Sequence, residues 1–320
     1  MTKRVAAVDC GTNSIRLLVT ELDPATGEAR ELDRRMRIVR LGQGVDATGR
    51  FADEALVRTF AACDEYAQVI ADLGAAQTRF VATSATRDAA NRGEFIAGIR
   101  ARLGVDPEVI SGDEEAGLSF TGATGALLAA EAAAGPQDGG ALHYPTPFLV
   151  VDIGGGSTEF VVGVDKVQAA RSVDIGCVRL TERHLHDDPP TSAQVSAARE
   201  DIDRAIDLAA ETVPLGDARS LVGLAGSVTT VAAIALGLPE YDRDRVHLSR
   251  IPADDVRAVT RDLLAMTREQ RAAVPSMHEG RVDVITAGAL VLERIVDRLG
   301  LPDVVVSEHD ILDGIAVSMR

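Results

Sequence analysis

The sequence predicts an α/β protein built from two related halves, and two observations support this fold class. Apolar segments with the character of β-strands alternate with segments of helical periodicity along most of the chain. In addition, one pattern occurs twice: an apolar strand ends at an aspartate, passes through a glycine-containing polar turn and resumes as a second apolar strand, at residues 5–22 and 150–162. Its aspartates, Asp9 and Asp152, lie 143 residues apart, which is about the size of one domain.

The first half is predicted to open with a three-strand meander and to continue with alternating helices and strands. The meander comprises residues 4–9, 15–22 and 28–40, with a turn over 23–30. The remaining elements are a glycine-rich loop at 41–51, a helix at 53–73, a strand ending near 82, a helix ending near 103, a short strand within 105–111 and a helix from about 111. This half is predicted to form a domain over residues 1–130.

The second half repeats this order and is predicted to form a domain over residues 131–320, with a link at 131–146. Its predicted elements are strands at 147–152, 158–164 and 167–174, helices at 178–186 and 192–211, a strand, turn and helix over 220–236, helices at 253–265 and 281–299, a strand at 303–307 and a helix from 310. Because ligands bind at the carboxyl ends of the strands in α/β sheets, both glycine turns are expected to face one interdomain cleft.

Composition limits the classes of partner. The chain has 320 residues, 46% of them hydrophobic, and a formal net charge of -16. This charge argues against binding to nucleic acid or to an anionic membrane. No apolar run approaches the ~20 residues that span a bilayer, so the protein is expected to be soluble and cytoplasmic. Its three cysteines, Cys10, Cys63 and Cys177, are scattered and are interpreted as small apolar residues.

The glycine turns carry the predicted chemistry. Glycine lets backbone N–H groups approach a ligand closely, and clustered N–H groups form a cup for an anion. Ser157 and Thr158 add hydroxyl donors, and Asp152 could hold a divalent cation on a phosphate. For a single turn of this kind a simple hairpin would be the preferred interpretation, but the second copy favours phosphate binding.

These motifs and their order resemble known proteins. The paired aspartate and glycine loops are similar to those of the actin, sugar kinase and Hsp70 ATPase superfold. Four stretches resemble the exopolyphosphatase and guanosine pentaphosphatase phosphohydrolase family: DCGTNSIR at 9–16, ATSATRDAAN at 82–91, VISGDEEAGLSFTGA at 109–123 and DIGGGSTEF at 152–160. The resemblance implies two ribonuclease-H-like, actin-like ATPase domains with an interdomain active-site cleft. Longer members carry further domains, so this chain, ending at Arg320, resembles a short two-domain form.

The resemblance also implies roles for acidic residues. Glu115 corresponds to the catalytic glutamate that would activate water, although from sequence alone it could simply complement a helix N-terminus. Asp152 is expected to hold Mg²⁺ or Mn²⁺. Glu159 could assist the metal or the water, or could be a polar residue on the open face of its strand. Asp9 could be a second metal residue, or could only brace its own loop.

The remaining candidates would contact substrate. Two sets of loop residues would cradle the terminal phosphates: Gly11, Thr12, Asn13 and Ser14, and Gly154, Gly155, Gly156, Ser157 and Thr158. Arg87 resembles the family's phosphate-contacting arginine, and Arg281 is a weaker candidate of the same kind. Ser84 is not expected to be a nucleophile, and the HD pairs at His186 and His309 are interpreted as structural or solvated.

The predicted function is Mg²⁺-dependent exopolyphosphatase activity, which releases orthophosphate from the ends of inorganic polyphosphate. An alternative in the same family is hydrolysis of the 5′-terminal phosphate of guanosine pentaphosphate. A non-hydrolytic sensor of phosphate or guanosine tetraphosphate is an alternative of another class, and a sugar or acid kinase is less favoured. Homodimerisation is expected from the resemblance alone.

Overall fold

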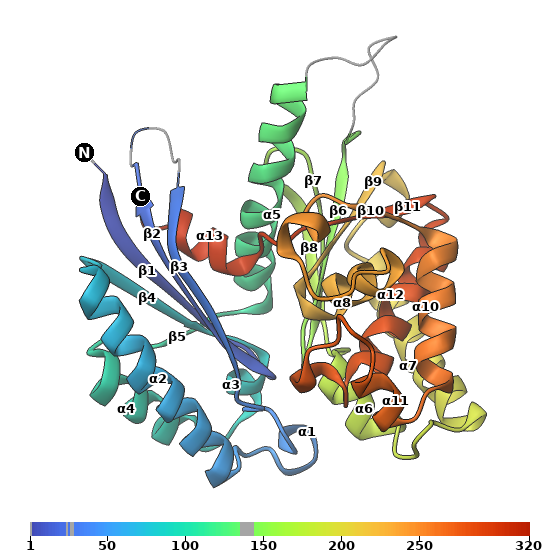
Figure 1. Ribbon diagram of the computed structural model, residues 1–320, viewed down its shortest axis with the longest axis horizontal. Coiled ribbons are helices and arrows are strands. Elements are labelled where there is room, and N and C mark those ends of the chain that lie inside the picture. Colours follow the sequence, from blue (N-terminus) through green and yellow to red (C-terminus); the bar gives the residue numbers. More distant parts are fainter. Residues whose placement is uncertain (1, 24, 26–28, 135–143) are drawn as a thin grey trace. The chain divides into compact units, whose positions relative to one another are not determined.

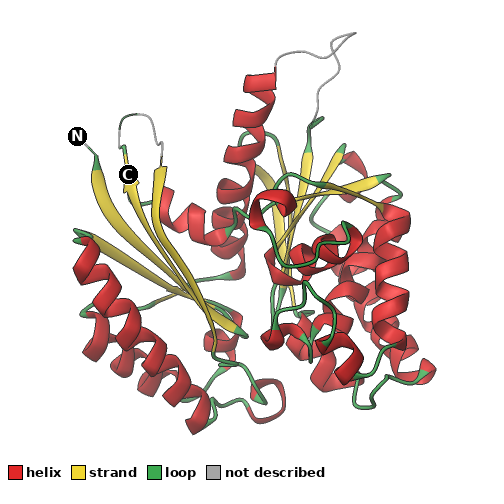
Figure 2. Cartoon of the chain, in the orientation of Figure 1, coloured by secondary structure: helices red, strands yellow, loops and turns green. Residues whose placement is uncertain are grey.

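The computed structural model describes residues 2–320 except 24, 26–28 and 135–143, and it divides the chain into two compact units (Figure 1). Unit 1 comprises residues 1–122 together with 311–320, and unit 2 comprises residues 123–310. In each unit helices flank a β-sheet (Figure 2). The units are therefore described one at a time.

The sheet of unit 1 has the strand order β3-β2-β1-β4-β5. Its strands are β1 (Lys3–Cys10), β2 (Ser14–Leu22), β3 (Ala29–Ile38), β4 (Gln77–Ala82) and β5 (Glu108–Val109). The first three strands are antiparallel neighbours, whereas β4 pairs with β1 in parallel and β5 pairs with β4 in parallel. The turn between β1 and β2 and the carboxyl end of β4 consequently lie at the same edge of the sheet.

The alternation of side chains along β1 divides the interior of unit 1 between two faces. Ala6 and Val8 pack on the core under helices α2 (Asp53–Leu73) and α4 (Arg92–Leu103). Val5 and Ala7 pack on a second cluster that includes α13 (Ile311–Val317), the helix that Figure 1 shows on the other side of this sheet. Two short helices, α1 (Val45–Thr48) and α3 (Ser84–Asp88), and the long helix α5 (Gly112–Ala134) complete the series.

The sheet of unit 2 repeats this topology around its own central hairpin, in the order β10-β11-β9-β6-β7-β8. Its strands are β6 (Phe148–Ile153), β7 (Thr158–Gly163), β8 (Val167–Val173), β9 (Ser220–Leu224), β10 (Arg250–Pro252) and β11 (Asp303–Val306). Strand β6 pairs in antiparallel fashion with β7 and in parallel with β9, as β1 does with β2 and β4. The internal repeat in the sequence is therefore a repeat of structure.

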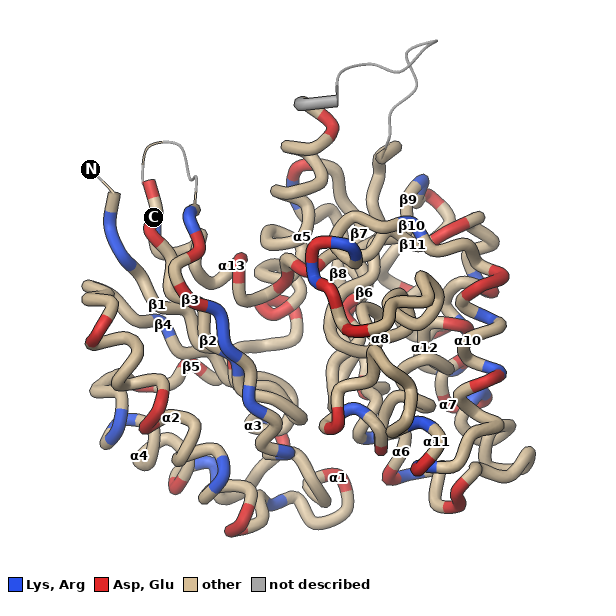
Figure 3. The backbone as a smooth tube through the Cα atoms, viewed as in Figure 1, with Lys and Arg blue, Asp and Glu red and all other residues tan. Residues whose placement is uncertain are grey.

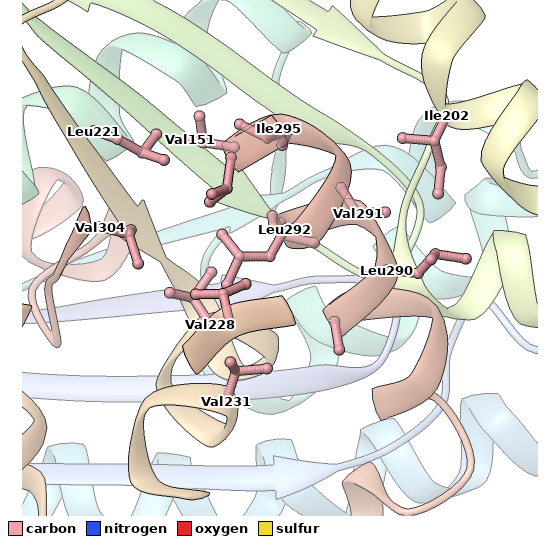
Figure 4. Packing of buried hydrophobic residues seen from close by; sticks show 14 of the residues in the cluster. Val151, Ile202, Leu221, Val228, Val231, Leu290, Val291, Leu292, Ile295 and Val304 are labelled. Carbon is pink, nitrogen blue, oxygen red and sulfur yellow. The ribbon is translucent and has the colours of Figure 1, made fainter. Parts of the chain in front are cut away.

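The helices of unit 2 enclose a large apolar core. They are α6 (Cys177–His184), α7 (Ser192–Ala210), α8 (Ala225–Ala235), α9 (Arg243–Val246), α10 (Ala253–Ala265), α11 (Arg268–Ala272) and α12 (Ile285–Leu299). Figure 4 shows the centre of this core, where Val151 of the sheet, Val228 of α8 and Leu292 of α12 gather, and all three are at most 1% exposed. Burial of such side chains stabilises the fold by about 1.5–3 kcal/mol each.

Most predicted elements are confirmed, but the short elements α1, α9, β10 and α11 were not predicted, and other differences lie at ends and boundaries. The predicted helix at 281–299 begins only at Ile285, because residues 279–281 form a separate 3₁₀ turn. The predicted domain boundary at residue 130 lies inside α5, and the structure divides the chain near residue 122 instead. Parts of the predicted turn at 23–30 and of the link at 131–146 lie outside the described residues.

Charged residues of both signs are interleaved over the elements of each unit (Figure 3). The arginines of β3, which appear there as a blue run, are held in ion pairs with Glu21, Glu31, Asp33 and Glu65. Surface pairs of this kind contribute little to stability. They do show that this basic strand is largely compensated by nearby acids.

Candidate functional site

The two glycine turns are closed by the same backbone hydrogen bond. In unit 1 the N–H of Gly11 donates to the carbonyl of Ser14 at 3.0 Å, and in unit 2 the N–H of Gly154 donates to the carbonyl of Ser157, also at 3.0 Å. Each turn joins the carboxyl end of a central strand to its antiparallel neighbour. The structure thus forms from both sequence motifs the same tight four-residue turn.

A second segment braces the loop of unit 1. The carbonyl of Asn13 accepts hydrogen bonds from the N–H groups of Val39, at 3.1 Å, and Arg40, at 2.9 Å, and Thr12 accepts one from Gly42 at 2.8 Å. A side chain at Gly42 would collide with Thr12, since an added Cβ would lie 2.2 Å from its Cγ2. The sequence indicated only a loop at 41–51, and the brace follows from this close packing.

The side-chain amide of Asn13 is a candidate ligand donor. Asn13 is 5% exposed, and its Nδ2 is buried without a hydrogen-bond partner among the described residues. A buried donor left unsatisfied costs roughly 1–3 kcal/mol. An anion at this turn would supply the acceptor, so the observation supports the predicted role of Asn13 in phosphate binding.

Three successive carbonyls of the unit 2 loop are bonded to residues at the start of α6. Gly154 accepts from the N–H of Cys177 at 3.0 Å, and Gly155 accepts from the N–H of Val178 at 2.9 Å. Gly156 accepts from the Nε of Arg179 at 2.7 Å. Since the C=O and N–H of a trans peptide point in opposite directions, the N–H groups of residues 155–157 point away from α6. Successive N–H groups on one side form an anion cup.

Two buried carboxylates lie beside this cup. Asp152 and Glu159 are direct cross-strand partners on β6 and β7, and they are 7% and 1% exposed. The hydroxyl of Ser172 donates to Glu159 at 2.7 Å. Like charges directly opposite each other destabilise a sheet, and a cation between them would remove this cost. This donor set fits Mg²⁺, which binds one or two carboxylates together with water and phosphate oxygens.

The corresponding position of unit 1 is arranged differently. Asp9 lies opposite Arg16, whose Nη2 and Nε lie 2.7 and 3.1 Å from its Oδ2. Here an arginine already supplies the positive charge, which favours a bracing role for Asp9 over the predicted metal role. Across the described parts of the chain, no three His, Cys, Asp or Glu side chains gather to hold a metal. A metal would therefore depend on substrate and water for its remaining ligands.

Unit 1 also brings Glu115 and Arg87 together. Arg87, in the last turn of α3, donates through Nη1 to Oε2 of Glu115 at 2.7 Å and to the carbonyl of Ile110 at 3.1 Å. The side chain of Glu115 is 11% exposed and lies in the first turn of α5. The predicted catalytic acid and the predicted phosphate-contacting arginine are thus direct partners, which their separation in the sequence did not indicate.

Arg281 lies near the unit 2 loop. Its guanidinium packs against Gly226 at the start of α8, where an added Cβ would lie 1.9 Å from Nη2. Burial raises the pKa of the Cys177 thiol, and the positive charge of Arg281 opposes that shift. Because Cys177 also donates its N–H to the loop, the arginine and the loop converge on the start of α6.

The structure also shows the environments of the other residues that the sequence singled out, and of these Thr158 differs from expectation. Thr158 is fully buried in β7, and its hydroxyl donates to the carbonyl of Ile175, which argues against a phosphate contact through that hydroxyl. Ser84 is buried at the start of α3. His309 stacks on His247 with ring centroids 4.7 Å apart, which agrees with a structural role. Arg179 was not predicted from the sequence. The nearby glycine, Gly176, is a local signal of close packing, and in the structure an added Cβ at this residue would lie 2.4 Å from Gly155.

The duplicated unit, with its turn between antiparallel strands and its parallel strand beyond, defines an α/β protein of the actin-like ATPase fold. Comparison with known proteins then identifies the family. The chain belongs to the Ppx/GppA phosphatase family, which it matches over residues 23–320.

Individual relatives agree with this assignment. The chain is 51% identical to exopolyphosphatase 2 of Mycobacterium tuberculosis over 99% of its own length and 98% of that protein. The crystal structure of an exopolyphosphatase-like protein is 46% identical, with a TM-score of 0.91 and coverage of 99% and 98% of the two chains. A Ppx/GppA family member from Aquifex aeolicus is 27% identical, with a TM-score of 0.77 and coverage of 100% and 98%.

None of the helices that the structure describes combines the length and the apolar character needed to cross a membrane. This agrees with the apolar runs of the sequence, each of which is shorter than a bilayer requires.

Proposed function

We propose that this protein is an exopolyphosphatase that hydrolyses the terminal phosphoanhydride bond of inorganic polyphosphate. The observation that carries the choice of substrate is the 51% identity, over nearly the whole of both chains, to a protein named exopolyphosphatase 2. The geometry of the site supports the chemistry independently. An anion cup beside two buried carboxylates suits the terminal phosphate of a chain and a cation bound to it.

The reaction is a hydrolysis in which one P–O bond replaces another. Water attacks the terminal phosphorus, the bridging P–O bond breaks, and orthophosphate and a chain shorter by one unit leave. In the proposed mechanism Glu115 accepts a proton from the attacking water. Arg87 holds the carboxylate of Glu115 through its 2.7 Å hydrogen bond and, in this proposal, also contacts a phosphate oxygen.

The loop of unit 2 and its acids have a separate task in this proposal. The N–H groups of residues 155–157 bind the oxygens of a phosphate, and Asp152 and Glu159 would hold Mg²⁺ or Mn²⁺. When bound, such a cation neutralises charge that develops on the phosphate oxygens. The prediction that both units act on one substrate in an interdomain cleft stays a prediction.

Replacement of Glu115 tests the proposal directly. We expect Glu115→Gln to lower kcat for phosphate release from polyphosphate by about 10²-fold or more, because the amide cannot accept the proton. KM should change little, since the amide keeps the size of the side chain and can still accept a bond from Arg87. Orthophosphate release would be measured with Mg²⁺ on short polyphosphate, long polyphosphate and guanosine pentaphosphate.

A matched control lies one residue away. Glu114 pairs with Arg79 at 2.8 Å on the same first turn of α5, and its side chain is 47% exposed, so Glu114→Gln should leave kcat unchanged. Full activity of Glu115→Gln would remove this residue from the mechanism. A folded wild-type protein that releases no phosphate from polyphosphate of any length would refute the proposed function, and preferred release from guanosine pentaphosphate would refute the proposed substrate.

A further inference from the structure

The hydrogen bonds that hold the unit 2 loop come from two kinds of donor. The carbonyls of Gly154 and Gly155 are held by backbone N–H groups in the first turn of α6, at 2.9 to 3.1 Å. The third carbonyl, that of Gly156, is held at 2.7 Å by a side chain, through the Nε of Arg179. Arg179 also donates its backbone N–H to Gly155 at 3.1 Å. Arg179 therefore donates hydrogen bonds to two consecutive peptide groups of the loop.

The orientation of each carbonyl decides where the next N–H points, because the peptide unit is planar and trans. With the Gly156 carbonyl directed at Arg179, the N–H of Ser157 is directed to the opposite side, together with the N–H groups of Gly155 and Gly156. Glycine permits backbone rotations that other residues resist. Without the bond from Arg179, the peptide between Gly156 and Ser157 could therefore rotate and turn its carbonyl oxygen toward the anion.

The surroundings of Arg179 match a bracing role. Its side chain is only 11% exposed, and it lies 4.0 Å from the carboxylate of Asp174, a residue whose side chain is 77% exposed. An ion pair with an exposed partner at this distance contributes little to the stability of the fold. Close packing supports the same contact, because Gly176 allows the start of α6 to approach Gly155 and Gly156 without a Cβ between them.

We propose that Arg179 is a positioning residue that keeps the N–H of Ser157 directed at the terminal phosphate of the substrate. The inference rests on the proposed function and adds to it a residue that supports the phosphate loop without contacting the reacting atoms. Binding of the phosphate, and not proton transfer, is the step that Arg179 serves. Its loss should therefore raise KM more than it lowers kcat.

The experiment compares Arg179 with a second arginine on the same helix. We expect Arg179→Ala to raise KM for polyphosphate by about tenfold, because the variant loses a hydrogen bond from a charged donor that orients the loop. Arg179→Lys keeps one donor and should recover part of this loss. The control is Arg183→Ala, because Arg183 lies one turn further along α6 and contacts Asp201 at 3.5 Å and the carbonyl of Asp174.

Added guanidinium ion, well below denaturing concentration, provides a test that a purely structural role would not pass. It should lower the KM of Arg179→Ala toward the wild-type value and should leave the KM of Arg183→Ala unchanged. An unchanged KM in Arg179→Ala would overturn the inference, and so would an equal rise in both variants. If Arg179→Ala does not fold, Arg179→Lys and Arg179→Gln take its place, and a wild-type KM in both would overturn the inference as well.

A binding measurement separates this inference from the proposed function. If the wild type released no phosphate, the proposed function would fail, and calorimetric titration with orthophosphate would test Arg179 by itself. Tighter binding by the wild type than by Arg179→Ala would support the positioning role. Equal binding by both, or no binding by either, would overturn it.

Discussion

At the scale of single residues, the two loops differ in the residue that lies opposite the aspartate. Asp9 faces Arg16, whereas Asp152 faces Glu159, although the two aspartates end equivalent strands. The first pair is neutral in sum and carries its own cation. The second pair places two acidic side chains opposite each other in a buried place, and we expect a bound cation to stabilise it.

This difference predicts that variants of the two aspartates respond differently to magnesium. Without metal, Asp9→Asn should lower the free energy of unfolding by about 2 kcal/mol, because it weakens the charge-assisted bonds of Arg16. Asp152→Asn should cost less, because it removes one of two like charges. Added Mg²⁺ should raise the thermal midpoint of the wild type and of Asp9→Asn, but not that of Asp152→Asn. Scanning calorimetry with Mg²⁺ and with a chelator measures these shifts, and an undiminished shift in Asp152→Asn would contradict the assignment.

At the scale of elements, short turns carry residues of the candidate site. Arg281 ends the 3₁₀ turn Glu279–Arg281, which His278 caps by accepting the N–H of Gly280 on its Nδ1 at 3.1 Å. An imidazole can accept this bond only while that nitrogen is unprotonated. Partial burial, and then the charge of Arg281, lower the pKa of His278 below its usual 6.5.

The sign of this shift predicts how the turn responds to pH. The unfolded chain takes up the proton near pH 6.5 before the folded turn does, so the contribution of His278 to stability is complete above pH 6.5 and is lost as the pH falls below it. His278→Asn keeps an acceptor that does not titrate. Lowering the pH from about 7 to about 5 should therefore lower the thermal midpoint of the wild type more than that of this variant. Thermal unfolding of both proteins across this range measures the difference. Parallel curves for the two proteins would contradict the prediction.

At the scale of the whole molecule, the chain ends in the unit where it began. Helix α13 packs Ile315 and Leu312 against Val5 and Leu18 of the first hairpin, so the last ten residues belong to unit 1. Helix α13 also packs closely against α5, since a Cβ on Gly314 would lie 2.0 Å from the carbonyl oxygen of Leu118. The predicted homodimer stays a prediction.

The packing of α13 predicts where its loss is felt. Ile315→Ala should lower the free energy of unfolding by about 2–5 kcal/mol, because Ile315 is fully buried. Val57→Ala, at a side chain of the same unit that is 67% exposed, should change it by no more than about 0.5 kcal/mol. Denaturant unfolding gives both values. Hydrogen exchange should accelerate in β1 and β2 of Ile315→Ala, and acceleration confined to unit 2 would contradict the assignment of α13.

Features that depend on near neighbours in the chain could be predicted from the amino-acid sequence. The strand, turn and strand motif and its second copy, the acids at the strand ends and the helix at 53–73 were all predicted, because side-chain periodicity and glycine act over a few residues. Phosphate chemistry followed from these local patterns and from the resemblance they carry.

Contacts between residues far apart in the sequence could be identified only in the folded chain. The pairing of Arg87 with Glu115, the grip of Arg179 on Gly156 and the return of α13 to unit 1 join segments separated by 23 to more than 280 residues. No local periodicity encodes such contacts, because they depend on how whole elements pack once each has buried its apolar face. For the same reason the acids could be predicted from sequence, whereas their partners could not.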